Sequence, residues 1–306
     1  MNKKNILALI ILVIIVGVYL IVNQDDASQE EFYYFQNTSD AYHTISISQG
    51  NDKITLVKNN NVWEMTEPVE SPIKKRKIDD LITKLTSSKT SSLPVSVSEK
   101  SQDIYNLTDS LATLITIHDS QGNELTKALI GKTDSPQFSY ARHPQSTEIY
   151  QLSENLSWTV NPDVNGWREN IVLELNSDNI IDFQVATQER EYKFTYADTL
   201  WKFTENDFTQ DVTDDNKIMK SLLNRFKSLR STNFLDNEFE SYEELLDTPY
   251  LSIKINTSDV GTKILTVIPY DATSDLLQLG SQKSPLYLIP KNIREDFDFE
   301  LDALVQ

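Results

Sequence analysis

Two short runs carry the side chains best suited to bind another molecule. Tyr140 and Arg142 alternate along one extended-looking stretch, and Trp167 and Arg168 are adjacent further along the chain. A guanidinium group donates paired hydrogen bonds to a carboxylate, and aromatic rings offer large contact surfaces. These four residues are our candidates for ligand or partner contact. An internal ion pair for Arg142 and an interlobe hinge contact for Trp167 and Arg168 fit the same pattern.

Catalytic side chains are sparse in this sequence. The chain of 306 residues has no cysteine, and its three histidines, His43, His118 and His143, are far apart. A thiolate nucleophile and cysteine-ligated zinc are therefore excluded, and the histidines show no metal-ligand spacing. No serine lies in a G-x-S-x-G elbow, so an envelope hydrolase has no recognisable machinery. We expect no catalytic residue, no cofactor and no metal site.

The charge balance argues against nucleic-acid binding. The chain has 28 Lys+Arg against 46 Asp+Glu, a formal charge of -18, whereas binding to phosphates requires a basic surface. Lys74 to Lys77 form the one dense basic run, and Asp79 and Asp80 follow closely. This spacing favours a solvated helix face, with contact to an acidic partner or a headgroup as the alternative.

Residues 6–22 are predicted to form a transmembrane helix. They are uncharged and rich in Ile, Leu and Val, with Lys3 and Lys4 before them and acidic residues after. Seventeen residues lie at the lower limit of a bilayer span, and the positive-inside rule places residues 1–5 in the cytoplasm. The sequence thus predicts a single-pass protein of the cell membrane with an extracytoplasmic ectodomain. A cleaved signal peptide and a buried core helix are the alternatives, although no A-x-A-like cleavage site follows.

The ectodomain is predicted to be an α+β tandem repeat. Trp201 follows Trp63 by 138 residues, and Ile255 follows Ile117 by the same interval. Each unit combines alternating strand patterns with one amphipathic helix, in the order β-β-α-β-β-β. The first helix carries Ile78, Leu81, Ile82 and Leu85, and Ser71-Pro72 are typical of its start. The predicted two-lobed body consists of a stalk (23–40), a first repeat (41–157), a linker (158–175) and a second repeat (176–306).

Several runs in a fixed order resemble one bacterial family. These runs are Asn61 to Val69, Asp109 to Ile117, Leu129 to Lys132, Ser139 to Arg142, Ile149-Tyr150 and Gly166 to Arg168. The chain is similar to the family called domain of unknown function 4340, over most of the first repeat and more weakly over the second. The second repeat departs from this pattern, because it has no equivalent of Tyr140-Ala141-Arg142.

The resemblance implies a membrane-anchored ectodomain beside an ABC-type permease and ATPase of the gliding-motility kind. We therefore expect a non-catalytic binding or scaffolding protein that is accessory to an envelope transport assembly. The alternative is a peptide- or glycan-binding module that uses the cleft between the lobes, with Arg142 or Arg168 reaching into it.

Overall fold

The computed structural model describes residues 31–35 and 38–304. The predicted cytoplasmic residues 1–5, the predicted transmembrane helix 6–22 and most of the stalk lie outside the described residues. Within the described ranges, no helix combines the length and apolar character needed to cross a bilayer. In the described part of the stalk, Glu31–Tyr33 form strand β1, which pairs with β6 (Lys89–Ser91). A short 3-10 turn, Ser39–Ala41, spans the end of the predicted stalk.

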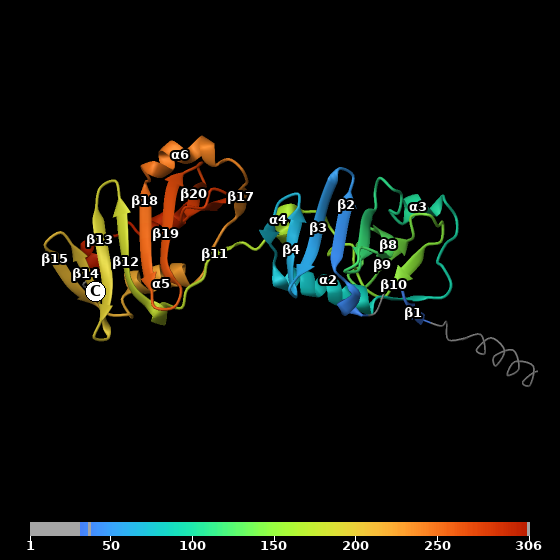
Figure 1. Cartoon of the computed structure of the whole chain (residues 1–306), viewed down its shortest axis with the longest axis horizontal. Helices are drawn as coiled ribbons and strands as arrows, with labels where there is room; N and C mark the ends of the chain where they lie inside the picture. Colours follow the sequence, from blue (N-terminus) through green and yellow to red (C-terminus); the bar gives the residue numbers. More distant parts are fainter. Residues whose placement is uncertain (1–30, 36–37, 305–306) are drawn as a thin grey trace, which may run out of the picture. The chain divides into compact units, whose positions relative to one another are not determined.

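The chain has a mixed α+β fold in two compact units, and the boundary falls between Glu169 and Asn170 (Figure 1). This boundary lies inside the stretch 158–175 that was predicted as a linker. Val160 and Trp167 are buried in the core of unit 1, whereas Leu173 and Leu175 are buried in the core of unit 2.

An eight-stranded antiparallel sheet, in the order β10-β9-β8-β7-β2-β3-β4-β5, forms the centre of unit 1. Its strands are β2 (Thr44–Gln49), β3 (Asp52–Asn59), β4 (Val62–Glu67), β5 (Ser71–Pro72), β7 (Thr113–His118), β8 (Glu124–Gly131), β9 (Ser139–Arg142) and β10 (Tyr150–Leu152). Its helices are α2 (Lys75–Ser87), α3 (Ser101–Ile104) and α4 (Val164–Trp167).

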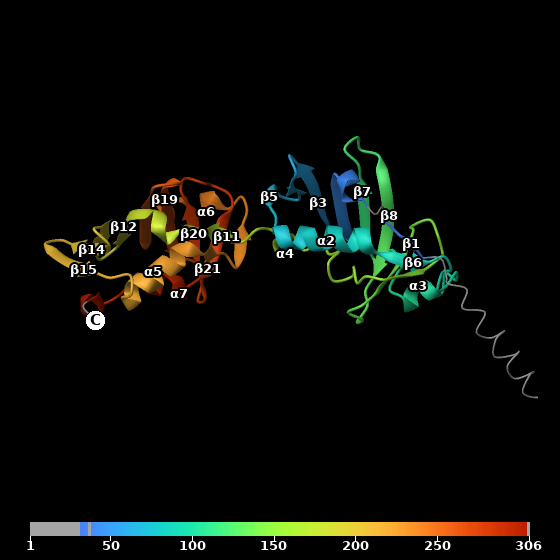
Figure 2. The same ribbon diagram turned by 90° about the horizontal axis from the view of Figure 1, so that it is seen from below.

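The two faces of this sheet have separate hydrophobic cores. Helix α2 covers one face, because Ile78, Leu81 and Leu85 recur at helical spacing and pack against the alternating apolar residues of the strands (Figure 2). A smaller cluster on the opposite face includes Leu107 and Leu129, and Leu129 alternates along β8 with Ala128 and Ile130 of the larger core. Both faces of β8 and β9 are therefore covered.

A nine-stranded antiparallel sheet, in the order β15-β14-β13-β12-β18-β19-β20-β21-β17, forms the centre of unit 2. Its strands are β12 (Ile180–Thr187), β13 (Glu191–Ala197), β14 (Leu200–Glu205), β15 (Phe208–Val212), β17 (Asn233–Leu235), β18 (Leu251–Thr257), β19 (Gly261–Pro269), β20 (Ser274–Leu279) and β21 (Leu286–Pro290). The remaining elements are β11 (Ile171–Leu173), β16 (Leu229–Arg230), α5 (Lys217–Lys227), α6 (Phe239–Asp247), α7 (Asn292–Glu295) and two short 3-10 turns, Ser177–Asn179 and Leu301–Leu304.

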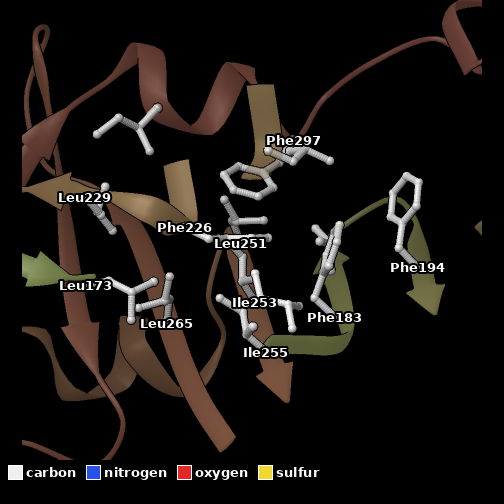
Figure 3. Packing of buried hydrophobic residues seen from close by; sticks show 14 of the residues in the cluster. Leu173, Phe183, Phe194, Phe226, Leu229, Leu251, Ile253, Ile255, Leu265 and Phe297 are labelled. Carbon is white, nitrogen blue, oxygen red and sulfur yellow. The ribbon is translucent and has the colours of Figure 1, made fainter. Parts of the chain in front are cut away.

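Aromatic packing dominates the core of unit 2. Phe226 of α5 lies over Leu251 and Ile253 of β18 in Figure 3, and its ring contacts that of Phe183 edge to face at 5.0 Å between centroids. Such edge-to-face pairs add to the area that the rings bury. Asn216 is the N-cap of α5, because its side chain accepts hydrogen bonds from the first-turn N–H groups of Ile218 and Met219.

The two sheets have the same strand pairings, and on three strands of each sheet the equivalent residues are 138 positions apart. In unit 1, Ile45 of β2 pairs with Leu56 of β3 and with Ile117 of β7. In unit 2, 138 residues later, Phe183 of β12 pairs with Phe194 of β13 and with Ile255 of β18. The interval shortens to 137 on the next strand, where β7 and β8 have a bulge at Ile117/His118 that β18 and β19 lack.

The local order of elements differs from the prediction at two places. Ser71 and Pro72 form β5, which pairs with Glu64 and Met65, and α2 begins only at Lys75. Each unit also has more strands before its main helix than the two predicted, because β4 and β5 are added in unit 1 and β14 and β15 in unit 2. Strand pairing thus takes precedence over the local helix-start signal of a Ser-Pro pair.

Candidate binding site

An open depression of about 470 Å³ lies on unit 1. It is formed by the end of α3, the connection from β8 to β9, strand β9 itself and the segment that follows β10. A volume of this size is in the range of small-ligand sites. Its lining residues are Ile104, Tyr105, Asn106, Lys132, Thr133, Asp134, Tyr140, Ser157 and Trp158.

Aromatic and aliphatic side chains supply the contact surface of the depression. The rings of Tyr105 and Tyr140 lie 4.5 Å apart, and Phe138 contacts Tyr140 edge to face. Trp158 is 60% exposed and Ile104 is 75% exposed, so solvent reaches both of these apolar side chains. Burial raises the pKa of Tyr140, with Tyr105 acting in the same direction, so the phenol stays protonated at neutral pH. The depression therefore offers ring faces together with a hydroxyl donor.

Two charged side chains of opposite sign also line the depression. Lys132 and Asp134 are both exposed, and neither forms an ion pair with a residue that the structure describes. Their charged groups are thus available to a ligand. Ser157 donates its hydroxyl to Asn155, which leaves the serine oxygen with acceptor capacity.

Arg142 stabilises the loop that forms one side of the depression. It is 4% exposed and lies two residues from Tyr140 on β9, so both side chains are on the same side of the strand. Its Nε donates to the carbonyl oxygen of Leu107 at 2.8 Å, and its Nη2 donates to Asp109 at 2.6 Å. The guanidinium group therefore ties the loop after Tyr105 to the sheet, and it positions the depression rather than lining it.

A close backbone approach fixes the same loop to β8. Asn106 has a positive φ of 55° and donates its side-chain amide to the carbonyl oxygen of Lys132 at 3.1 Å. A Cβ on Gly131 would clash with the carbonyl oxygen of Tyr105, so only glycine allows this approach.

Two buried polar side chains hold the opposite wall. Asn155 donates to the carbonyl oxygen of Ser135 in the β8–β9 connection. The hydroxyl of Ser139 donates to the carbonyl oxygen of Glu154 at 2.9 Å and accepts from the N–H of Leu156. The segment that presents Trp158 is thereby bound to the start of β9.

The structure does not bring the four predicted residues together. Trp167 is fully buried in the core on the α2 side, its indole N–H donates to Asn161, and the Lys77 ammonium lies 4.3 Å above its ring. Arg168 is 1% exposed and pairs with Ile73 in an isolated bridge. Of the four residues, only Tyr140 lines the depression, and Arg142 acts through the loop beneath it.

The basic run has two kinds of side chain. Lys75 and Arg76 are exposed, as expected of a solvated face, and Lys75 forms an i,i+4 ion pair with Asp79 at 2.5 Å. Lys74 and Lys77 are half-buried and donate to Gly166 and Asn161. Half of the run therefore binds α4 and the segment before it to the start of α2.

Sequence reasoning missed Tyr105, Lys132, Asp134 and Trp158. Tyr105 and Trp158 are separated by more than fifty residues and meet only because the chain folds back beside β9. One available signal was Gly131, because the chain has only seven glycines and an isolated glycine in a strand often marks a close backbone approach.

A family model described as Domain of unknown function (DUF4340) matches residues 63–249, which is more than half of the chain. The chain belongs to the DUF4340 family. The matched region contains every residue of the depression and extends into unit 2. No curated protein matches this DUF4340 chain. Among the residues that the structure describes, no group of three or more His, Asp or Glu is arranged to hold a metal ion.

Proposed function

We propose that this DUF4340 protein is a membrane-anchored ectodomain that acts by binding, as an accessory component of an ABC-type envelope transport assembly. The proposal combines the apolar segment 6–22, which would anchor the chain with its N-terminus in the cytoplasm, with the resemblance to ectodomains that accompany a permease and an ATPase. The observation that supports a binding role most directly is the depression on unit 1.

The construction of the depression supports recognition by contact. Tyr140 is on strand β9, and its neighbours Tyr105 and Trp158 are on segments that Arg142, Asn106 and Asn155 hold in place. Binding costs less when the contact surface is already ordered, because fewer side chains and loops lose freedom on association. A preformed aromatic depression is therefore suited to seat one segment of a partner.

We also propose that units 1 and 2 are copies of one ancestral α+β unit. Support comes from four residues that pair with one another across neighbouring strands of unit 1, namely Ile45, Leu56, Met65 and Ile117. The residues 138 positions later pair in the same way in unit 2, namely Phe183, Phe194, Phe203 and Ile255. The depression has no counterpart in the aligned strands of unit 2, since Leu276, Leu277 and Gln278 occupy the places of Tyr140, Ala141 and Arg142. The copies would then have diverged in their binding surfaces.

Site-specific photocrosslinking in cells tests the binding role. A photoreactive phenylalanine analogue at Trp158 should give a covalent adduct with a multispanning permease or its associated subunit after solubilisation of membranes in detergent. The control position is Val62, which is 59% exposed on β4 of the same unit and does not line the depression. Identical adducts at both positions, or none at position 158, would contradict the proposal.

A soluble peptide or glycan is the second candidate occupant. The exposed indole of Trp158 favours it, because aromatic faces stack on the apolar face of a sugar ring or on a peptide side chain. The other three tryptophans, Trp63, Trp167 and Trp201, are at most 9% exposed, so quenching by acrylamide reports mainly on Trp158. Protection from quenching by added oligosaccharide or peptide, absent in a Trp158→Phe chain, would support this occupant.

A further inference from the structure

An irregular segment of unit 1, with bends at Leu93 and Val95, has its apolar side chains on the outside. Leu93, Val95 and Val97 alternate along the chain after β6, and they are 63%, 45% and 62% exposed. The intervening Ser96 is half-buried and donates its hydroxyl to Ser101 at 2.8 Å. This order is the reverse of the usual apolar-in, polar-out alternation of a surface strand.

The backbone of this segment fixes the direction of the side chains. The N–H of Val95 donates to the carbonyl oxygen of Ile149 at 2.8 Å, and the N–H of Ile149 donates back to Ser96 at 2.8 Å. In the isolated bridge, Ser96 is opposite the buried Ile149, so the side chains on either side of Ser96, Val95 and Val97, point away from the core. The exposure is thus built into the fold.

The exposed segment adjoins the first described strand of the chain. Leu93 and Val95 line the same open hollow as Glu31 of β1. Tyr33 follows Glu31 by two residues on β1, so the two side chains are on the same side of the strand, and Tyr33 is 44% exposed. We call Tyr33, Leu93, Val95 and Val97 the apolar rim.

The charged residues that border the rim are balanced in sign. Lys89 lies 3.8 Å from Glu31 and also 5.5 Å from the centre of the Tyr33 ring. Glu99 and Lys100, beyond the far end of the segment, are likewise of opposite sign. The rim therefore has no excess charge to repel a neutral surface, in contrast to the chain as a whole with its formal charge of -18.

We infer that the apolar rim lies at the surface of the outer leaflet of the cell membrane, where it contacts the headgroups and upper acyl chains of zwitterionic lipids. Only eight residues separate Val22, the end of the proposed anchor, from Glu31, and eight residues reach at most about 29 Å. The rim begins two residues after Glu31, so the proposed anchor would keep it close to the bilayer. Tyr favours the membrane interface, and aliphatic side chains gain by leaving water.

This inference rests on the proposed anchor, and the experiment separates the two. The natural chain has no cysteine, so a single cysteine gives a unique label site in the full-length protein. We would label Val95→Cys and Val97→Cys with an environment-sensitive fluorophore and reconstitute each chain in phosphatidylcholine vesicles that contain a shallow nitroxide lipid. The matched controls are Val62→Cys on β4 of the eight-stranded sheet and Val260→Cys in unit 2, both exposed.

We expect at least about twofold stronger quenching at positions 95 and 97 than at the controls, because interfacial side chains reach about 5–10 Å into the headgroup region. A label at Ser98→Cys should lose its quenching when Leu93→Ser and Val95→Ser are added. Equal, weak quenching at all sites in chains that resist alkaline carbonate extraction would overturn the inference and leave the anchor intact. Release by carbonate would instead refute the anchor. Emission shifts that appear without nitroxide lipid and depend on protein concentration would show that a second copy covers the rim, which also overturns the inference.

Discussion

The ammonium nitrogen of Lys77 lies 4.3 Å from the centre of the Trp167 ring, with Asn161 accepting a hydrogen bond from the same nitrogen. Burial lowers the pKa of Lys77 to about 8, Asp163 opposes this shift, and Lys74 adds to it. The folded chain therefore holds this proton less tightly than the unfolded chain. Folding stability should rise with pH from about 8 until the ordinary lysine pKa of about 10.4 is passed.

Replacement of Lys77 by Met should remove this pH dependence. We expect the melting temperature of the wild-type chain to increase relative to that of Lys77→Met as the pH is raised from about 7 to about 10, since only the wild type loses an unfavourably buried charge. Thermal unfolding followed by circular dichroism measures the difference. Lys75→Met is the matched control, because the Lys75 side chain is 85% exposed on the same helix. Parallel curves for wild type and Lys77→Met would show that burial does not perturb this lysine.

Gly131→Ala should distort the depression. The added Cβ would clash with the carbonyl oxygen of Tyr105, and a backbone atom cannot rotate away as a side chain can. We expect a loss of about 1–3 kcal/mol in the free energy of unfolding, together with altered acrylamide quenching of Trp158. Gly122→Ala is the control, because Gly122 has a φ of +82° and no atom near its Cβ position. This control should lose stability through backbone strain without changing the quenching, and the same quenching change in both variants would argue against a local effect.

Removal of Arg142 should cost more than removal of its ion-pair partner. Arg142→Met leaves the carbonyl oxygen of Leu107 without its donor, and we expect a loss of about 1–3 kcal/mol. The Asp109 side chain is 87% exposed, so Asp109→Ala should cost no more than about 1 kcal/mol. Urea unfolding of the two variants gives the comparison. Equal costs would mean that the ion pair, and not the support of the loop, is the principal role of Arg142.

The helix and strand faces could be predicted because their signals are local. Ile78, Leu81 and Leu85 recur at the helical period and are buried in α2, and the alternation of β2 and β3 matches their buried positions. The start of α2 could not be predicted, because Ser71 and Pro72 pair with residues of β4 that a local pattern does not identify.

The candidate site was only partly predictable for the same reason. Tyr140 was identified because it is an aromatic residue beside an arginine in a strand-like run. Its neighbours Tyr105 and Trp158 come from segments whose meeting depends on buried hydrogen bonds of Arg142 and Ser139. The exposed environment of Trp158 leaves no periodic signal, since periodicity reports burial on one face of an element.

Asp275 should make unit 2 less stable as the pH rises above the ordinary carboxyl range. It is fully buried on β20, no described residue donates a hydrogen bond to its oxygens, and Arg294 lies 3.3 Å away as its ion-pair partner. Burial raises the pKa of Asp275 against the opposing effect of Arg294, so the folded state holds the proton more tightly than the unfolded state. Its contribution is therefore fully present below the ordinary pKa of about 3.9 and is lost as the pH rises through the folded value.

Asp275→Asn should flatten this part of the curve of urea midpoint against pH. Asp271→Asn should act in the opposite sense, because hydrogen bonds from the N–H groups of Thr273 and Ser274 lower the pKa of Asp271. If the two variants change the curve in the same direction, burial does not control the protonation of Asp275.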